Sequence, residues 1–194
     1  MAYANDGNWF WIDGELFLAQ AWFTRQRAQE RKRLGLPLER KFATKIELGW
    51  RMMERVSLEG LPFEMVCCDT LYGRSHWLRR KMSSAGLIYY AAVPVDTRVY
   101  VAQPVVGVPA HKKGRRATKP RVLRAEKPLE VRPLATLPAT VWTRIKVRST
   151  ERGYLNDEFS ARRIWTTYNG EQGFLIKRNL QTRMHTVIFY SFAT

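Results

Sequence analysis

Residues 62–94 read PFEMVCCDTLYGRSHWLRRKMSSAGLIYYAAVP and contain two short apolar runs separated by a segment with helical spacing. The runs at 62–68 and 87–94 predict two buried strands. Between them, Ser75 is placed to cap a helix. The inner side of that helix is expected to carry Trp77, Leu78, Met82 and Ala85. Two apolar strands joined by a helix favour a parallel pair with a right-handed crossover.

The segment before these strands predicts a longer helix. Thr44 and Glu47 have the spacing of a capping box, in which each side chain bonds the backbone amide of the other residue. An apolar side follows at spacings of three and four, formed by Ile46, Trp50, Met53 and Val56. Gly60 suits the position just after a helix, and Pro62 prevents continuation.

The N-terminal part contains two turn dipeptides, Asp6-Gly7 and Asp13-Gly14. They predict the end of one strand at 2–4, a turn, and a second strand from Asn8 to Leu18 that is bulged at Asp13-Gly14. Residues 25–34 are polar and charged, which predicts a short exposed helix or a loop.

The last third of the chain changes character and predicts four strands separated by turn residues. These are expected at 141–147, 161–168, 173–178 and 185–192. The predicted fold class is therefore α/β, with a core at 1–100 followed by a largely antiparallel β region at 101–194.

Positive charge is concentrated in one stretch. The chain has 194 residues and a formal net charge of +16, and residues 111–149 hold twelve basic and two acidic residues. Four prolines in this stretch argue against a helix, and its basic part at 111–132 is expected to be an extended, mobile loop. Two interpretations remain open: a solvated loop with no specific partner, or a loop that contacts phosphate groups.

Composition excludes several classes of protein. The hydrophobic fraction of 45% is enough for a packed core, so wholesale disorder is excluded. No apolar run is long enough to cross a membrane, and the N-terminus has no secretory pattern. The adjacent Cys67 and Cys68 cannot form a disulfide framework, which fits a reducing, cytoplasmic compartment. A basic protein of this kind is expected to have a polyanionic partner, most often a nucleic acid.

Asp69 is the sharpest candidate for chemistry, because it follows a predicted buried strand directly and precedes a turn. Two interpretations stay open: a turn or helix-capping residue, or a ligand of a divalent metal ion. Mg²⁺ prefers carboxylate oxygen and needs two or three acids that converge from different strands, so Asp69 alone cannot form such a site. The other acids considered are expected in turns or loops, namely Asp13, Asp96, Asp157 and Glu158.

Other reactive side chains give weaker signals. The three histidines, at 76, 111 and 185, show no metal-ligand spacing, and the two cysteines are expected to pack as small apolar groups. Trp77, Trp142 and Trp165 each lie in an apolar pattern, which favours core packing over stacking on nucleobases.

Residues 42–100, FATKIELGWRMMERVSLEGLPFEMVCCDTLYGRSHWLRRKMSSAGLIYYAAVPVDTRVY, contain four pieces in a defined order: F-x-T-K, G-[LIV]-P-F, D-x-x-Y-G, and A-V-P followed by T-R-V. Together they resemble the central part of the DDE superfamily endonuclease transposases of bacterial insertion sequences. WIDGELFLAQAWF at 11–23 is similar to an upstream family segment, although Ala19 stands where a proline is usual. FSARRIW at 159–165 and FLIKRNL at 174–180 resemble the β insertion of the same group.

The resemblance implies a ribonuclease-H-like core with a β insertion between the second and third catalytic acids. It implies binding of transposon-end DNA and the use of Mg²⁺ or Mn²⁺, held by Asp, Asp and Glu, for attack on phosphodiesters. On this basis Asp69 is the second acid, both catalytic residue and metal ligand, while Tyr72 and Gly73 match the turn after it. DNA contacts are expected from Arg74, Arg79, Arg80, Lys112, Lys113, Arg115, Arg116, Lys119 and Arg121.

The resemblance also places two family acids outside this chain. The first Asp belongs to a strand upstream of residues 2–4, and the third Glu belongs to a helix that would follow residue 194. Each loss of 1.4 kcal/mol in transition-state stabilisation slows a reaction about tenfold. The chain is therefore expected to be a truncated transposase that is inactive alone and binds its metal ion poorly.

Two other functions stay open. One is a non-catalytic DNA-binding remnant that regulates transposition, by occupying transposon ends or by pairing with the full-length transposase. The other is an unrelated basic RNA-binding protein. The expected location is the cytoplasm, in association with the nucleoid, with no membrane partner.

Overall fold

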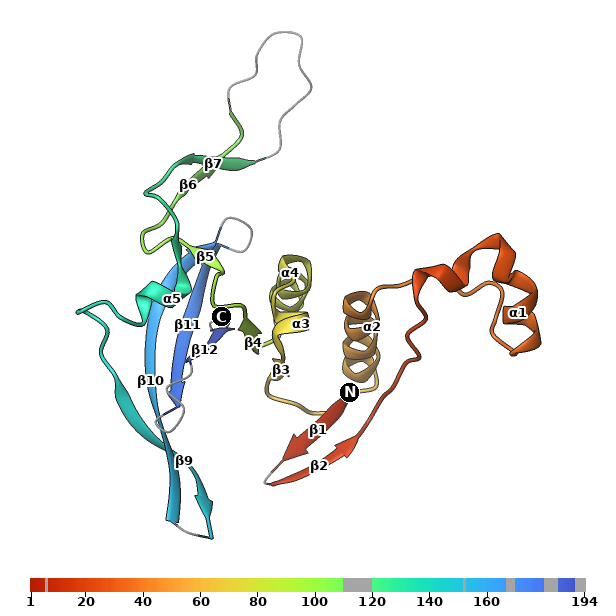
Figure 1. Ribbon diagram of the computed structural model, residues 1–194, viewed down its shortest axis with the longest axis horizontal. Helices are drawn as coiled ribbons and strands as arrows, with labels where there is room; N and C mark the ends of the chain where they lie inside the picture. The colour runs from red at the N-terminus through yellow and green to blue at the C-terminus, as the bar shows by residue number, and fades with distance from the viewer. Residues whose placement is uncertain (6, 110–119, 152, 167–169, 180–184, 191–194) are drawn as a thin grey trace. The chain divides into compact units, whose positions relative to one another are not determined.

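The computed structural model describes residues 1–5, 7–109, 120–151, 153–166, 170–179 and 185–190. The chain divides into two compact units, Met1–Phe63 and Glu64–Thr194 (Figure 1). This division falls at a different place from the boundary expected after residue 100, because the strand that follows Asp69 belongs to the same sheet as the C-terminal strands.

The first unit begins with a hairpin of β1 (Ala2–Asn5) and β2 (Asn8–Trp11), which pair antiparallel. Gly7 has a φ of 85°, which suits the turn between them. Trp9 and Trp11 lie on one face, with ring centroids 5.9 Å apart, and both are exposed. The strand expected to continue to Leu18 is wrong, since no strand follows β2 before residue 20.

A short helical stretch follows, made of η1 (Gln20–Phe23), η2 (Arg25–Arg27) and α1 (Ala28–Arg33). The expected short helix is confirmed, but one of its residues, Arg31, is buried. The Arg31 guanidinium donates to the backbone oxygens of Pro37 (2.6 Å) and Arg40 (3.0 Å). This side chain and the bond from the Leu36 amide to the Arg31 carbonyl hold the segment after α1 against the helix.

Helix α2 (Lys45–Leu58) begins as the sequence predicts. The capping box is present, because Thr44 accepts from the Glu47 amide while Glu47 accepts from the Thr44 amide at 2.7 Å. These bonds from Thr44 lower the pKa of Glu47. The buried residues differ slightly from the expected set: they are Leu48, Gly49, Trp50, Met53 and Val56.

Arg55 on α2 forms ion pairs that the sequence did not indicate. It contacts Asp13 at 2.8 Å and Glu15 at 3.2 Å. The hydrogen bond with Asp13 raises the pKa of Arg55, partly opposed by burial. Asp13 also accepts from the Gly14 amide and anchors α2. The chain forms no turn at Asp13-Gly14, so the turn expected there is wrong.

The second unit is built on one six-stranded sheet, in the order β3-β4-β12-β11-β10-β9. Its strands are β3 (Val66–Cys68), β4 (Tyr89–Val93), β9 (Thr143–Thr150), β10 (Gly153–Thr166), β11 (Gly170–Asn179) and β12 (His185–Tyr190). The predicted parallel pair is confirmed, with Cys67 opposite Tyr90, and all other pairs are antiparallel. Both apolar strands are shorter than the runs at 62–68 and 87–94 that predict them.

The connection between β4 and β9 contains the strands β5 (Arg98–Val99), β6 (Val105–Gly107), β7 (Arg121–Arg124) and β8 (Leu129–Glu130), followed by the helix α5 (Val131–Leu134). The expectation of no helix in 111–149 is wrong at this one turn. Pro133 is the third residue of α5, where the amide has no partner within the helix, so the ring costs no hydrogen bond. Of the basic loop expected at 111–132, residues 111–119 lie outside the described residues. The rest is not a continuous loop, because it contains β7 and β8.

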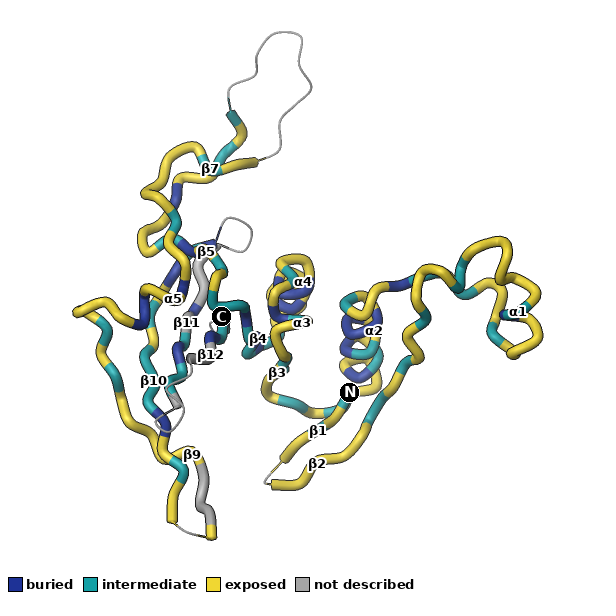
Figure 2. The backbone as a smooth tube through the Cα atoms, in the orientation of Figure 1, coloured by how far each residue is buried: buried dark blue, intermediate teal, exposed yellow. Residues whose placement is uncertain are grey.

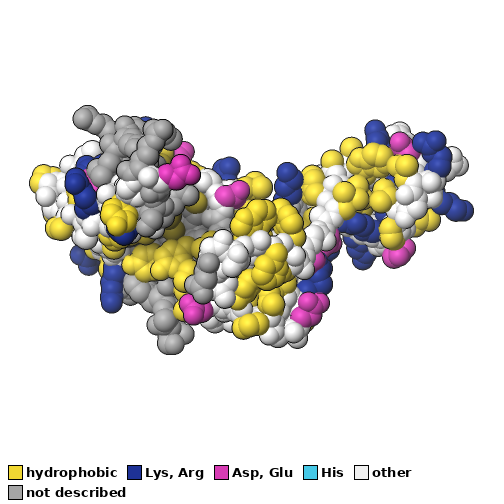
Figure 3. Space-filling view, turned by 90° about the horizontal axis from the view of Figure 1, so that it is seen from below, with side chains coloured by type: hydrophobic (Ala, Val, Ile, Leu, Met, Phe, Trp, Pro, Cys, Tyr) yellow, Lys and Arg dark blue, Asp and Glu magenta, His cyan; other side chains and the backbone are white. Residues whose placement is uncertain are grey.

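One face of the sheet carries the core of this unit. Buried positions recur along its strands (Figure 2). Side chains from β4, β10, β11 and β12 pack there against β5 and α5. The core residues are Val93, Val99, Val131, Leu134, Ala135, Ile164, Ile176, Val187 and Phe189. Burial of this apolar surface, at about 25 cal/mol per Å², is the main source of stability for the unit. Hydrophobic side chains nevertheless also reach the surface of the molecule in several places (Figure 3).

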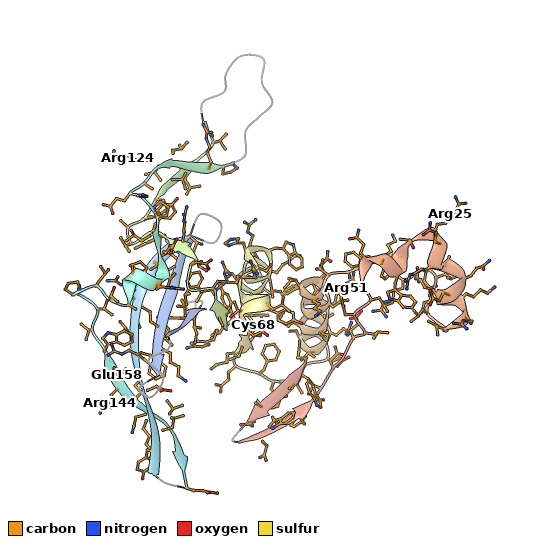
Figure 4. All side chains as sticks on the ribbon, in the orientation of Figure 1. Arg25, Arg51, Cys68, Arg124, Arg144 and Glu158 are labelled. Atoms are coloured by element: carbon orange, nitrogen blue, oxygen red, sulfur yellow. The ribbon has the colours of Figure 1, made fainter. Side chains whose placement is uncertain are left out.

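Asp157 and Glu158 are not the turn residues that the sequence suggests, because both lie within β10. Asp157 is fully buried and pairs with Lys177 of β11 at 2.8 Å. Glu158 lies on the opposite face, between Arg178 of β11 and Arg144 of β9 (Figure 4). These cross-strand pairs fix the register of the long strands.

Helices α3 (Thr70–Gly73) and α4 (His76–Ser84) connect β3 to β4. Ser75 caps α4 as predicted, accepting from the Leu78 amide at 3.2 Å. Gly73 is buried and packs directly on β4, where an added Cβ would overlap the carbonyl oxygen of Ala92. Only glycine permits this approach of α3 to the sheet.

Replacing Gly73 with alanine should lower the free energy of unfolding by about 2 kcal/mol or more, because backbone atoms must move to make room. Chemical denaturation of the full chain measures this loss. Gly107→Ala is the matched control, since its Cβ would meet only the flexible end of Leu123. Equal stability of the two variants would contradict the close packing of Gly73.

Candidate functional site

Asp69 lies at the carboxyl end of β3 and is the N-cap of α3. Its Oδ1 accepts hydrogen bonds from the Leu71 amide (2.9 Å) and the Tyr72 amide (3.3 Å). The capping interpretation of Asp69 is thus confirmed. The residue is exposed, and both of these bonds use the same carboxylate oxygen, so the cap fixes the direction of the side chain without burying it.

The two residues expected to support Asp69 both lie in α3. Tyr72 is half-buried and donates its amide to Asp69, while Gly73 packs against β4. The Gly73 amide also donates to the Asp69 backbone oxygen at 2.7 Å. The D-x-x-Y-G pattern therefore describes one compact turn that holds the carboxylate at the edge of the sheet.

Arg79 lies in the interior rather than on a DNA-binding surface, since only 1% of it is exposed. Its guanidinium donates to the Gly73 carbonyl, lies 2.9 Å from the His76 Nδ1, and stacks 5.2 Å from the Phe189 ring centroid. Its Nε has no hydrogen-bond partner. A phosphate group has no access to it, so the expected DNA contact is corrected: Arg79 holds the end of α3 against α4.

Burial also sets the protonation of the groups around this corner. It lowers the pKa of Arg79, and it lowers that of His76 with help from the Arg79 and Arg80 charges. Burial, followed by the Asp69 charge, raises the pKa of Cys68 to about 11. Cys68 is therefore a thiol at neutral pH and not an activated nucleophile. Cys67 is exposed, contrary to the expectation that both cysteines pack in the strand.

The other basic residues proposed to contact DNA fall into two groups. Arg74 and Arg80, which flank the corner, are exposed, as is Arg121 on β7. Arg124 on the same strand also points outward (Figure 4). The remaining candidates lie outside the described residues: Lys112, Lys113, Arg115, Arg116 and Lys119.

The three tryptophans expected in the core behave differently. Trp142 packs on the core and lies 4.1 Å from the Arg178 guanidinium, and Trp165 is half-buried. Trp77 is 44% exposed, and Ala85 is also exposed. The expectation that both lie on the inner side of α4 is wrong. The inner side is instead formed by Leu78, Arg79 and Met82. Sequence spacing alone did not show that Arg79, rather than Trp77, lies on the buried side of the helix.

The described residues do not by themselves form a metal site. Within them, no group of three or more His, Cys, Asp or Glu side chains is close enough to hold an ion. Asp69 offers one carboxylate, and a hard divalent cation needs several oxygen ligands. Over the same part of the chain, no helix is both long and apolar enough to span a membrane.

The arrangement defines a class: a mixed α/β protein whose parallel strand pair presents an exposed carboxylate at the sheet edge, beside a basic helix. A family model described as DDE superfamily endonuclease matches residues 1–154. The chain therefore belongs to the DDE superfamily endonucleases, as a transposase-like protein. No curated protein and no solved structure matches it.

Arg79→Ala should lower the free energy of unfolding by about 3 kcal/mol, because it leaves a cavity and removes the donor to the Gly73 carbonyl. Arg79→Met should cost less, since it keeps the volume and removes a buried charge. Denaturation monitored by circular dichroism measures both changes. Arg80→Ala, at an exposed neighbour, should change stability by at most about 0.5 kcal/mol. The internal role of Arg79 fails if Arg79→Ala is as stable as Arg80→Ala.

Proposed function

We propose that this chain is a DNA-binding part of a DDE transposase and contributes Asp69 to a DNA-cleavage centre. The observation that carries the proposal is the position of Asp69, exposed at the carboxyl end of β3 and held there by a turn with the D-x-x-Y-G pattern. Membership of the DDE superfamily endonucleases supports DNA as the substrate.

The finer fold assignment also belongs to this proposal. A parallel pair joined by helices, with an insertion that continues the same sheet, suits a ribonuclease-H-like core with a β insertion. In parallel sheets, ligands bind at the carboxyl ends of the strands, which is where Asp69 lies.

The charge around Asp69 favours a polyanion. Between Asp69 and Asp96 the sequence contains no acidic residue, and its charged side chains are Arg74, Arg79, Arg80 and Lys81. Three of these four are exposed. Together with the basic segment at 111–132, they would attract the phosphate backbone to the same unit that carries Asp69.

The metal-dependent chemistry of the family requires more carboxylate ligands than the described residues bring together. Mg²⁺ or Mn²⁺ would activate a water molecule or a 3′ hydroxyl for attack on phosphorus. The described residues supply Asp69 and no partner acids grouped with it, so they do not fit a metal ion on their own. Further carboxylates would have to come from other parts of a complete transposase, and no catalytic step is assigned to this chain alone.

An alternative within the same proposal is a non-catalytic regulator of transposition. Such a protein would bind transposon ends, or full-length transposase, and would not use Asp69. For both the transposase and the regulator, we propose an origin in an insertion sequence and an association with the nucleoid.

The chain should bind duplex DNA with a strong dependence on salt. Each phosphate contact contributes a slope of about −0.9 in log K against log[salt]. Replacing Lys112, Lys113, Arg115, Arg116 and Lys119 with glutamine should make this slope shallower by up to about 4.5. The matched control changes five exposed basic residues of the first unit: Arg25, Arg27, Lys32, Arg33 and Lys41.

Fluorescence anisotropy at several salt concentrations gives the slopes. Preference for a terminal inverted repeat over a random duplex is expected, and equal binding of RNA would favour the unrelated RNA-binding function. An equal change of slope in the two charge variants would show that the basic segment at 111–119 has no special role.

The isolated chain should not cleave DNA with Mg²⁺ or Mn²⁺, because one carboxylate cannot hold the ions that cleavage requires. A labelled transposon-end duplex, resolved on a denaturing gel, measures strand cleavage. Asp69→Asn is the diagnostic variant. Robust cleavage by the wild-type chain that this substitution abolishes would show that the chain carries a complete centre.

A further inference from the structure

Trp77 is a large aromatic side chain on the exposed side of α4. Helix α4 buries Leu78 and Met82 completely, yet Trp77 in its first turn leaves 44% of its surface exposed. Keeping a large aromatic ring in water forgoes the free energy that burial would supply. Exposure alone does not define a site, since many large hydrophobic side chains of the described residues are exposed. The residues around Trp77 decide what it could bind.

The surroundings of Trp77 are basic. Arg80 and Lys81 follow it by three and four residues, so all three lie on one side of α4, together with Ser84. The Lys81 ammonium is 5.9 Å from the Trp77 ring centroid. These four residues, Trp77, Arg80, Lys81 and Ser84, are all exposed and are called the α4 outer face.

We propose that the α4 outer face binds DNA at an unpaired base, which stacks on the Trp77 indole while Arg80 and Lys81 contact the adjacent phosphates. The inference rests on the proposed function, because it requires that the chain binds DNA. Aromatic rings flanked by cations bind single-stranded nucleic acid in this way, since every base has a π-face and every linkage a negative charge. A fully stacked duplex does not present such a face, so the occupant is a base that has left the stack.

The chain contains a natural comparison in Trp9 and Trp11. These residues are even more exposed, at 64% and 73%. Residues 1–12 contain no lysine or arginine, however, so this hairpin has no counterpart of the basic side chains that follow Trp77. Of these three tryptophans, Trp77 is the one whose exposed ring has lysine and arginine beside it on the same helix face.

The place of Trp77 in the fold links the contact to the proposed chemistry. Asp69 begins α3, Gly73 ends it, and α4 follows after the Ser75 cap. Arg79 ties the two helices together through the Gly73 carbonyl. A base stacked on Trp77 would therefore be fixed relative to the Asp69 carboxylate, so Trp77 would be a positioning residue for DNA.

The test compares two labelled DNA duplexes of one sequence, fully paired or with a single unpaired thymine, by fluorescence anisotropy at fixed salt. Wild-type chain should bind the second duplex more tightly. Trp77→Ala should weaken binding to the unpaired-base duplex by about 5- to 150-fold, and change binding to the paired duplex less than about twofold. Trp77→Phe should retain most of the preference, because it keeps an aromatic ring.

Trp11→Ala is the matched control, as it removes an exposed tryptophan from a segment without lysine or arginine, and it should leave both affinities unchanged. Circular dichroism of each variant confirms the fold. An unchanged preference in folded Trp77→Ala, or an equal loss in Trp11→Ala, would overturn the inference while leaving DNA binding intact. If the wild-type chain binds neither duplex, the proposed function fails together with the inference.

Discussion

The hydrogen bond from the Arg79 guanidinium to the Gly73 carbonyl lies in the interior of the corner between α3 and α4. Burial of a cation costs several kcal/mol unless hydrogen bonds and nearby dipoles compensate. Here the compensation comes from the free end of α3, where carbonyl oxygens have no partner in the helix, and from the face of Phe189. A helix end and a buried charge thus satisfy each other, and the turn that carries Asp69 depends on both.

Asp69 has a structural role that does not conflict with chemistry. The Asp69 carboxylate is held by backbone amides at the start of α3, which fixes its direction. A fixed direction is also what a metal ligand requires. A chain that lacks the other catalytic acids would still need Asp69 to fold the turn. The presence of Asp69 alone therefore does not show that the chain carries an active centre. Its exposure and the basic residues around it are the stronger indications.

Local signals in the sequence predicted much of the fold. The capping box at Thr44, the Ser75 cap and the parallel pair each depend on residues close together along the chain, so they can be read directly. The cross-strand pair of Glu158 and Arg178 could not, because its partners are 20 residues apart and meet only once the register is fixed. At the site, the turn around Asp69 was predictable, whereas the inward Arg79 and outward Trp77 were not. Hydrophobic periodicity assumes that an aromatic residue is buried and an arginine is exposed. In α4, Arg79 is buried and Trp77 is exposed.

The strand β4 connects the turn at Asp69 to the antiparallel part of the sheet. It pairs with β3 on one side and β12 on the other, and Gly73 packs on its backbone at Ala92. A slip of β12 by one residue would move Phe189 from the core face to the opposite face. The Arg79 guanidinium would then lose the ring on which it lies. The long strands of the insertion therefore do more than extend the sheet: their register sets the packing under α3, and through it the position of the carboxylate that the proposed chemistry uses.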